Sequence, residues 1–302
     1  MTRKHGGMSF SVFKKVIDEA ARHCTEVTLT NFGENFLNKE IYQMIRYAKS
    51  KGVKNVSTFS NFLTVSEANI KEIVDSGLDE IVISIDGMDQ ATYEKFRVGG
   101  NFTKVIDNMR FLVEEKKRKS SRKPIIEVQC LLTKDTERNL SGIYKFLSSL
   151  GTDRVAFKAL FLYIRDFQHI TEADLENAYR FLPQQEELRV YALEHDTMSW
   201  RFNCNVNSCT DLWRSITLTW DGKIIPCCFD WDAEYILGDI TEESFARIWN
   251  GPNYRKLRID FLKGNFNLCR NCPASVFNKF YINIEKYFKR QYGTRSKQCN
   301  IC

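Results

Sequence analysis

Cysteines gathered in the last third of the chain are the residues best suited to do chemistry. Eight of the ten lie beyond residue 200, and they are Cys204, Cys209, Cys227, Cys228, Cys269, Cys272, Cys299 and Cys302. Two thiolates separated by two residues bind one metal centre from a tight turn, and two more complete a tetrahedral set. We predict that the set, called here the four predicted ligands, is Cys209, Cys227, Cys269 and Cys272.

The spacing leaves two points open. A four-thiolate zinc site and a 4Fe-4S cluster are both consistent with it, and Cys204 and Cys228 compete for two of the four places. No role is assigned to Cys299 and Cys302. Disulfides are the less favoured use of these residues, because charged residues between Lys14 and Glu19 occupy the place of a signal segment and the thiols of a cytoplasmic chain stay reduced.

A predicted hairpin positions Cys227. Apolar residues alternate from Ile216 to Trp220, and Asp221-Gly222 is typical of a two-residue turn between antiparallel strands. The returning strand leads to Cys227, which would fold back toward the strand that follows Cys209. The hairpin therefore indicates how cysteines that are distant in the sequence converge.

Helix and strand alternate through the first 160 residues. Five short apolar runs, each preceded by apolar residues at helical spacing, predict strands at 27–30, 56–59, 81–85, 125–132 and 155–160. This order implies parallel strands joined by right-handed crossovers, in a barrel or a doubly wound sheet. Because the first recognisable element is a helix around Phe13, either the fold lacks its first strand or the chain lacks its true beginning.

Polar residues follow these predicted strands at the point where each one ends. In both folds the chemistry lies at the carboxyl ends of the strands, and those ends hold Gly33 and Glu34, Ser60 and Asn61, Ser84, Asp86 and Gly87, Gln129 and Cys130, and Lys158. Since polar residues are also common in ordinary loops, the set is more informative than any one of its members.

Charge and hydropathy argue against two classes of partner. The net charge of +6 is mild, and the densest basic run, from Lys116 to Lys123, falls where a solvated loop is expected. No uncharged apolar run approaches the roughly 18 residues of a membrane helix. In the tail, an apolar stripe from Phe277 to Phe288 predicts a helix docked on its own domain. We expect no nucleic-acid partner, no membrane partner and a cytoplasmic location.

The cysteine-rich segment resembles the C-terminal SPASM or twitch domain of radical S-adenosylmethionine (radical SAM) enzymes. Gly222 stands between the first two of the four predicted ligands at the spacing of that pattern, and the other two follow downstream. No further cysteine follows the pair until Cys299, so the segment looks like the shorter version with one auxiliary 4Fe-4S cluster. The resemblance thus favours iron over zinc.

The resemblance extends to the strand ends. Gly33-Glu34 is similar to the family's Gly-Gly-Glu-Pro segment, which holds the amino group of S-adenosylmethionine, although the flanking residues depart from it. Asn61 resembles the polar residue after the next strand, and the segment from Ser84 to Asp86 resembles the one near the cofactor's ribose and carboxylate. The resemblance therefore implies that Gly33, Glu34, Asn61, Ser84 and Asp86 bind S-adenosylmethionine.

One family motif is missing. The radical cluster is held by CxxxCxxC ahead of a segment like Gly7-Met8-Ser9-Phe10, and this sequence contains no such motif. Three thiolates must hold three irons while the fourth iron binds the cofactor, and Cys24 alone cannot supply them. The absent motif and the absent first strand fall at the same place, so the simplest interpretation is an N-terminal truncation. Natural loss of the radical cluster is the alternative.

The resemblance implies an α/β fold: a partial (β/α) barrel of parallel strands lacking its first strand, then a small cysteine-rich α+β domain with a β-hairpin. The expected parts are a radical-SAM-like partial barrel at 1–165, a helical connector at 166–203, an iron–sulfur domain at 204–275, and a C-terminal helix and tail at 276–302.

The implied activity is that of an oxidoreductase. When full length, such a protein modifies a small molecule or a peptide through hydrogen abstraction by a 5′-deoxyadenosyl radical, with an electron donor such as flavodoxin or ferredoxin. The alternative is a non-catalytic iron–sulfur or metal-binding protein that has lost the radical cluster.

Overall fold

The computed structural model describes most of the chain, namely residues 2–30, 32–162, 164, 170–194, 197–201, 209–269, 272, 281–284 and 286–288. These residues form two compact units. The first comprises Met1–Ser84, Thr103–Glu127 and Cys204–Ser275, and the second comprises Ile85–Phe102, Val128–Asn203 and Val276–Cys302. Each unit is described separately.

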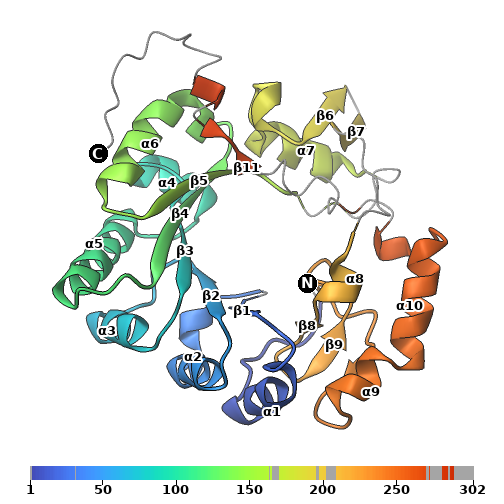
Figure 1. The fold of residues 1–302 in the computed structure, drawn as a ribbon. Coiled ribbons are helices and arrows are strands. Elements are labelled where there is room, and N and C mark those ends of the chain that lie inside the picture. Colours follow the sequence, from blue (N-terminus) through green and yellow to red (C-terminus); the bar gives the residue numbers. More distant parts are fainter. Residues whose placement is uncertain are drawn as a thin grey trace. The chain divides into compact units, whose positions relative to one another are not determined.

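The first three strands of the first unit run parallel to one another (Figure 1). β1 (Glu26–Leu29) pairs with β2 (Asn55–Ser60), and β2 pairs with β3 (Glu80–Ser84), both in parallel register. The next strand, β4 (Ile125–Leu132), enters the sheet with a 2.8 Å bond from the Ile125 N–H to the Asp79 carbonyl. Strand order through the sheet is β1-β2-β3-β4-β5-β11. The alternation of helix and strand in the sequence therefore produces parallel neighbours in chain order.

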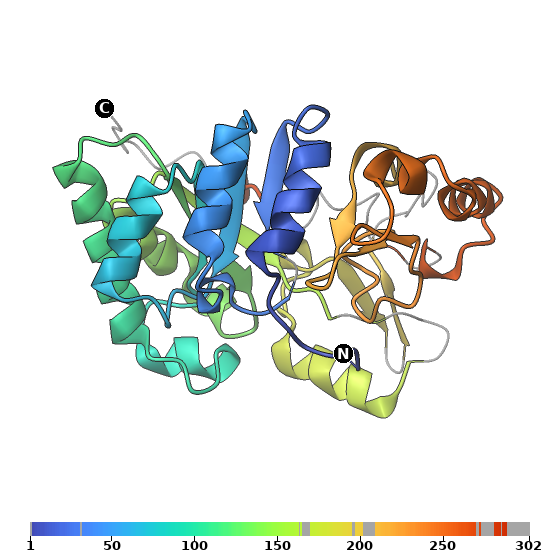
Figure 2. The same cartoon turned by 90° about the horizontal axis from the view of Figure 1, so that it is seen from below.

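Amphipathic helices cover these strands. α1 (Phe10–Ala20), α2 (Ile41–Ser50) and α3 (Glu67–Asp75) lie along one face of β1, β2 and β3, as Figure 2 shows from below. The side chain of Ser9 caps α1, and a reciprocal capping box starts α3, so short polar residues begin both helices. α5 (Phe102–Arg118) buries the residues at helical spacing that predicted it.

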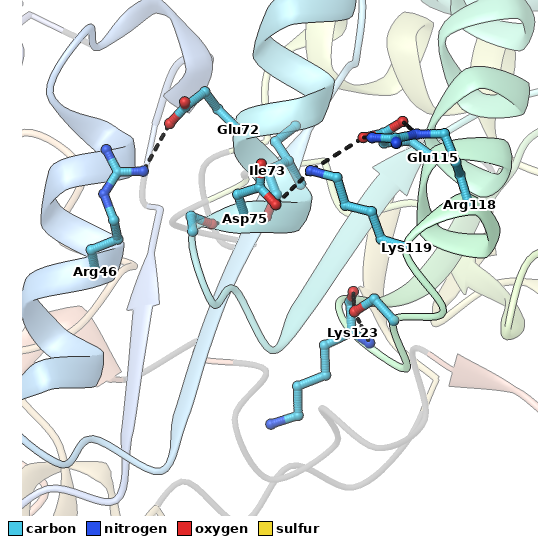
Figure 3. Close-up of polar contacts among 10 residues, drawn as sticks. Arg46, Glu72, Ile73, Asp75, Glu115, Arg118, Lys119 and Lys123 are labelled. Carbon is cyan, nitrogen blue, oxygen red and sulfur yellow. Dashed lines mark hydrogen bonds and ion pairs between the residues drawn. The ribbon is translucent and has the colours of Figure 1, made fainter.

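An ion-pair network ties α5 to α3 (Figure 3). Lys119 Nζ lies 2.5 Å from Asp75 Oδ1 and 3.2 Å from Glu115 Oε1. Arg118 donates two hydrogen bonds to the Glu115 carboxylate, at 2.8 and 2.7 Å. These cations, Arg118 first, lower the pKa of Glu115 to about 2. The basic run beyond α5 therefore contributes to helix packing as well as to the solvated surface.

The cysteine-rich part of the first unit contains small helices and strands. They are α8 (Asp211–Arg214), β8 (Thr217–Leu218), β9 (Lys223–Ile225), β10 (Gly238–Asp239), α9 (Phe245–Trp249), α10 (Pro252–Leu262) and the 3-10 turn η6 (Asn267–Cys269). The strands form an antiparallel sheet in the order β10-β9-β8. Apolar side chains of α8, β9, α9 and α10 share one core beneath it.

The predicted β-hairpin is β8-β9, and its loop is one residue longer than expected. Leu218 pairs with Ile224, and the Thr219 N–H donates to the Lys223 carbonyl at 2.9 Å, so residues 220–222 form a three-residue loop. Gly222 closes it at φ +90. A left-handed glycine at the third position is how a three-residue loop matches the twist of its strands.

This loop also contacts the N-terminal segment. Trp220 Nε1 donates a 3.2 Å hydrogen bond to the carbonyl of Lys4. Gly6 passes so close to the indole that a Cβ built on it would lie 2.5 Å from the ring. Residues 2–9 are therefore packed against the hairpin that leads to Cys227.

The second unit continues the sheet. Its elements are α4 (Gln90–Phe96), the 3-10 turn η2 (Thr136–Asn139), α6 (Leu140–Ser149), β5 (Arg154–Ala159), α7 (Glu172–Phe181), η4 (Glu186–Leu188), β6 (Tyr191–Glu194), β7 (Thr197–Trp200) and β11 (Tyr281–Ile282). β6 and β7 form a separate antiparallel hairpin. β11 adds to β5 in the antiparallel sense, so the sheet ends in a mixed edge.

The fold class is confirmed: a mixed α/β chain with a curled sheet of mostly parallel strands and a later small domain containing a β-hairpin. Two local expectations need correction. Tyr281 and Ile282 form β11, because β5 offers them a free edge to pair with, although the apolar stripe predicted helix there. The connector expected to be helical also contains strands, since Tyr191–Glu194 pairs with Thr197–Trp200 as β6 and β7. The predicted domain boundaries stay predictions.

Candidate functional site

Glu34 is held at the end of the first two strands by a set of hydrogen-bond donors. Its Oε1 accepts from the Ser60 hydroxyl at 2.7 Å and from the Phe36 N–H at 3.3 Å, and its Oε2 accepts from the Asn61 N–H at 2.8 Å. Hydrogen bonds of this kind favour the ionised carboxylate. The side chain of Glu34, predicted from its place after a strand, is therefore fixed by the two residues that end β2.

The turn after β2 is itself fixed. Asn61 Oδ1 accepts from the Leu63 N–H at 2.9 Å, and the Phe62 N–H donates to Ser60 Oγ at 2.9 Å. Phe62 is fully buried and adopts φ +59, a conformation that costs a non-glycine residue about 1–3 kcal/mol. Asn108 donates to the Phe62 carbonyl at 2.9 Å and so helps to hold it. The Asn61 N–H is thereby aimed at Glu34.

Glu34 has no counter-ion among the described residues. The carboxylate is half-buried, and no cationic side chain among the described residues pairs with it. Gly33, beside it, is exposed. An anionic group held in place without a counter-ion is suited to bind an ammonium group.

The remaining two predicted residues, Ser84 and Asp86, differ from each other. Ser84 ends β3, is partly exposed, and its hydroxyl has no recorded hydrogen bond. Asp86 is 1% exposed, and its two oxygens accept from Arg97 Nε at 2.6 Å and from the Leu131 N–H at 2.7 Å. Asp86 therefore fixes the loop after β3 against β4, within the second unit.

The four predicted ligands all belong to the first unit. Cys209 lies two residues before α8, Cys227 follows β9, and Cys269 ends η6. The Cys272 N–H donates to the Cys269 carbonyl at 3.2 Å, which closes the turn between the last two. All four side chains are partly buried.

Some thiols of this set affect one another's pKa values. Burial raises the pKa of Cys227 far above its usual range, and nearby Cys228, Cys272 and Cys209 raise it further. Burial also raises the pKa of Cys269 to about 12, with further contributions from Cys227 and Cys209. Cys209 and Cys272 thus act electrostatically on Cys227, and Cys209 and Cys227 on Cys269, while convergence of the four on one centre stays a prediction.

The donor set fits a multi-iron cluster. Among the described residues, no three His, Cys, Asp or Glu side chains lie close enough to hold a single metal ion. In a 4Fe-4S cluster each cysteine takes its own iron, so the thiolates lie further apart than the four around one zinc at about 2.3 Å. Four cysteines, one for each iron, are the donor set that such a cluster takes.

The other cysteines fall outside this set. Cys228 is exposed beside Cys227, Cys24 is half-buried, and Cys130 is fully buried within β4. Cys204, named above as a competing ligand, lies outside the described residues, as do Cys299 and Cys302.

Two supporting residues had no assigned role in the sequence. Ser60 supplies the hydroxyl that holds Glu34, and its position next to Asn61 at a strand end was the available signal. Asp230 is fully buried and accepts from the N–H groups of Glu234 at 2.9 Å and Tyr235 at 3.0 Å. It fixes the loop that follows Cys227, and nothing in its spacing distinguishes it from a surface acid.

Comparison with family models agrees with this division of the chain. Residues 209–273 match SPASM, described as an iron–sulfur cluster-binding domain, and residues 1–129 match the radical SAM superfamily. The first match contains all four predicted ligands, and the second contains Glu34 and Asn61. The resemblance drawn from these residues is confirmed.

Curated relatives and solved structures extend over most of the chain. The tungsten-containing aldehyde ferredoxin oxidoreductase cofactor-modifying protein of Pyrococcus furiosus is 22% identical over 295 residues, covering 89% of this chain and 80% of that protein. The cysteine-type anaerobic sulfatase-maturating enzyme of Clostridium novyi is 24% identical over 291 residues, covering 87% and 74%. Native anSMEcpe with bound AdoMet superposes with a TM-score of 0.60 at 15% identity, covering 96% and 90%, which shows a shared fold.

Membrane insertion has no support within the part of the chain that the structure describes. None of its helices combines the length and the apolar character that crossing a bilayer requires.

Proposed function

The chain is a radical SAM protein with a SPASM domain, and we propose that it binds one auxiliary 4Fe-4S cluster through Cys209, Cys227, Cys269 and Cys272. The observation that carries this proposal is the match to SPASM, an iron–sulfur cluster-binding domain, over residues 209–273, which contain all four cysteines. Thiolate is the ligand form of cysteine, so buried thiols with raised pKa values gain most from iron, which replaces their protons.

S-adenosylmethionine is the proposed second cofactor, with Glu34 binding its amino group. Support comes from the absence of a cationic partner for Glu34 among the described residues, and from the three donors that orient its carboxylate. Asn61 and Gly33 would line the same strand ends. Ser84 is proposed to meet the cofactor's hydroxyl groups, and Asp86 to fix the loop that follows Ser84.

The proposed reaction class is oxidative modification of a small molecule or a peptide. S-adenosylmethionine would supply hydrogen abstraction from an unreactive C–H bond only together with a radical cluster, whose three thiolates residues 1–129 do not provide. The named relatives modify a cofactor or mature a sulfatase, so both substrate classes are represented among them. An electron donor such as flavodoxin or ferredoxin is part of the proposal.

Radical chemistry needs three thiolates that this sequence does not provide in the matched region. Residues 1–129 contain one cysteine, Cys24, and no CxxxCxxC. The residues present therefore do not fit a radical cluster, and we derive no step through one. This observation favours a second candidate, a binding protein that holds the auxiliary cluster without cleaving S-adenosylmethionine.

Anaerobic reconstitution with iron and sulfide tests the proposal. We expect about four irons per chain, as one 4Fe-4S cluster contains, and loss of that iron in a C269A/C272A variant. Formation of 5′-deoxyadenosine on addition of S-adenosylmethionine and reductant would contradict the binding-protein candidate. Zinc in place of iron, or retention of the iron by the double variant, would refute the cluster assignment.

A further inference from the structure

Two buried hydrogen-bond donors beside the cysteine centre have no acceptor. Tyr254 is 0% exposed and its hydroxyl makes no hydrogen bond. Nη2 of Arg258, one turn further along α10, is also buried and unbonded. A buried donor without a partner costs about 1–3 kcal/mol, and most such groups in folded proteins have an acceptor. Two of them on neighbouring side chains point to an acceptor that the polypeptide itself does not supply.

The position of Tyr254 shows which functional groups lie near its hydroxyl. Tyr254 belongs to the apolar core of the cysteine-rich part, and Cys209 and Cys269 pack against that same core. Cys209 and Cys269, two of the four predicted ligands, therefore lie against the core that contains the unbonded hydroxyl.

Arg258 is held rigidly in the same place. Its Nε donates to the Leu212 carbonyl at 3.0 Å, and its Nη1 donates to the Trp249 carbonyl at 3.0 Å. The guanidinium carbon lies 4.3 Å from the centre of the Trp249 ring and 4.8 Å from that of Tyr254. Nε thus holds α8 at Leu212, Nη1 holds the end of α9 at Trp249, and only Nη2 remains without a partner.

We propose that sulfur of the bound cluster is the missing acceptor, and that the Tyr254 hydroxyl and Arg258 Nη2 raise the reduction potential of the cluster by donating hydrogen bonds to it. Reduction adds negative charge, and a donor stabilises the more negative state more strongly. Tyr254 is in this role a positioning and tuning residue. The proposal rests on the cluster assignment made above.

The test compares reduction potentials of reconstituted wild-type protein and a Y254F variant. The substitution keeps the ring packed against Trp249 and removes only the hydroxyl. We expect a full iron content and a potential that falls by about 59 mV, the one-electron equivalent of a tenfold change in the equilibrium constant. Redox titration followed by the spectrum of the reduced cluster measures it. An unchanged potential in Y254F overturns the proposal.

A Y235F variant is the matched control. Tyr235 packs against the same core, yet its hydroxyl is not among the buried unbonded atoms, so its loss should leave the potential unchanged. A fall as large as that of Y254F would mean that any phenol in this core has the effect, and would overturn the assignment to Tyr254.

A second variant guards against failure of Y254F to assemble a cluster. Incorporating 3-fluorotyrosine at position 254 makes the hydroxyl a stronger donor while retaining the hydrogen bond, so the potential should rise. No rise contradicts the proposal. If wild-type protein binds no cluster at all, the proposed function is wrong. If it binds a cluster whose reduction potential does not change in the Tyr254 variants, only the present proposal is wrong.

Discussion

Glu34 and the four predicted ligands lie in the same unit but differ in what they need. Glu34 already has three hydrogen-bond donors, all supplied by the chain. Cys209, Cys227 and Cys269 have raised pKa values because burial penalises their charged form. The difference indicates that the carboxylate site is preformed, whereas the cysteine site gains its final stability only when a metal takes the place of the thiol protons.

The largest expected effect is a difference in iron binding between variants of two adjacent cysteines. C227A should abolish nearly all iron binding, because Cys227 lies among the other predicted ligands, whereas C228A should retain it, because Cys228 is exposed. Iron and sulfide content per chain after anaerobic reconstitution measures both. If C228A loses iron and C227A does not, Cys228 takes the ligand place and the assignment of the hairpin cysteine is wrong.

A second prediction tests whether Asp86, unlike Glu34, belongs to a structural ion pair. Arg97 already supplies the counter-ion of Asp86. D86A should therefore destabilise the fold by about 3 kcal/mol, the cost of breaking a buried pair. Its partner Arg97 is 28% exposed and partly screened, which limits the loss. D135A, which removes the exposed partner of Lys95 in the same unit, should cost under about 1 kcal/mol. Urea unfolding at neutral pH measures both values.

Equal losses for the two variants would show that Asp86 is not a structural ion pair. A stable D86A protein with weakened S-adenosylmethionine binding would instead assign Asp86 to the cofactor directly.

The third prediction concerns Glu34. E34Q should weaken S-adenosylmethionine binding by about tenfold, because a charge-assisted hydrogen bond is worth about 1.5–3 kcal/mol. Stability should change less, since the amide retains one acceptor oxygen. Calorimetric titration is the measurement, and E40Q is the control, because Glu40 accepts the Phe10 N–H instead. Equal affinity of E34Q and wild type would remove Glu34 from the site.

The smallest expected effect is a pH dependence of the metal-free cysteine site. The pKa of Cys269 is raised from an ordinary value of 9.0 to about 12 in the folded chain. Its contribution to stability is therefore complete below pH 9 and is lost as the pH rises from 9 toward 12, where only the unfolded chain ionises the thiol. Relative to C269S, metal-free wild-type protein should lose melting temperature between pH 8 and pH 10.

Metal-loaded wild type, whose sulfur is already thiolate, should not show this relative loss. A pH-independent difference between metal-free wild type and C269S would mean that Cys269 is not desolvated.

Sequence patterns predicted most of the parallel sheet because their signals are local. Strand 125–132 coincides with β4, and four other strands lie within one residue of their predicted bounds. The four predicted ligands followed from spacing and from the hairpin signal at Gly222. β11 could not be predicted, because a two-residue strand is formed by pairing with β5 and has no periodicity of its own.

The partners of individual side chains were also beyond the sequence. Nothing in the spacing of Asp86 and Arg97 separates a buried ion pair from two solvated residues, since burial depends on how β4 packs. In the sequence, Tyr254 and Arg258 are indistinguishable from other members of an amphipathic helix. Their unbonded donors become visible only when the core around Cys209 and Cys269 is assembled.

The close approach of Gly6 to Trp220 has a consequence for substitution. With only hydrogen on its α-carbon, residue 6 lets the backbone lie flat on the indole. A methyl group there would displace either the indole ring or the backbone around residue 6. Trp220 is the first residue of the β8-β9 loop, and β9 leads directly to Cys227. A change as slight as G6A, far from any thiol in the sequence, should therefore alter the environment of the iron centre.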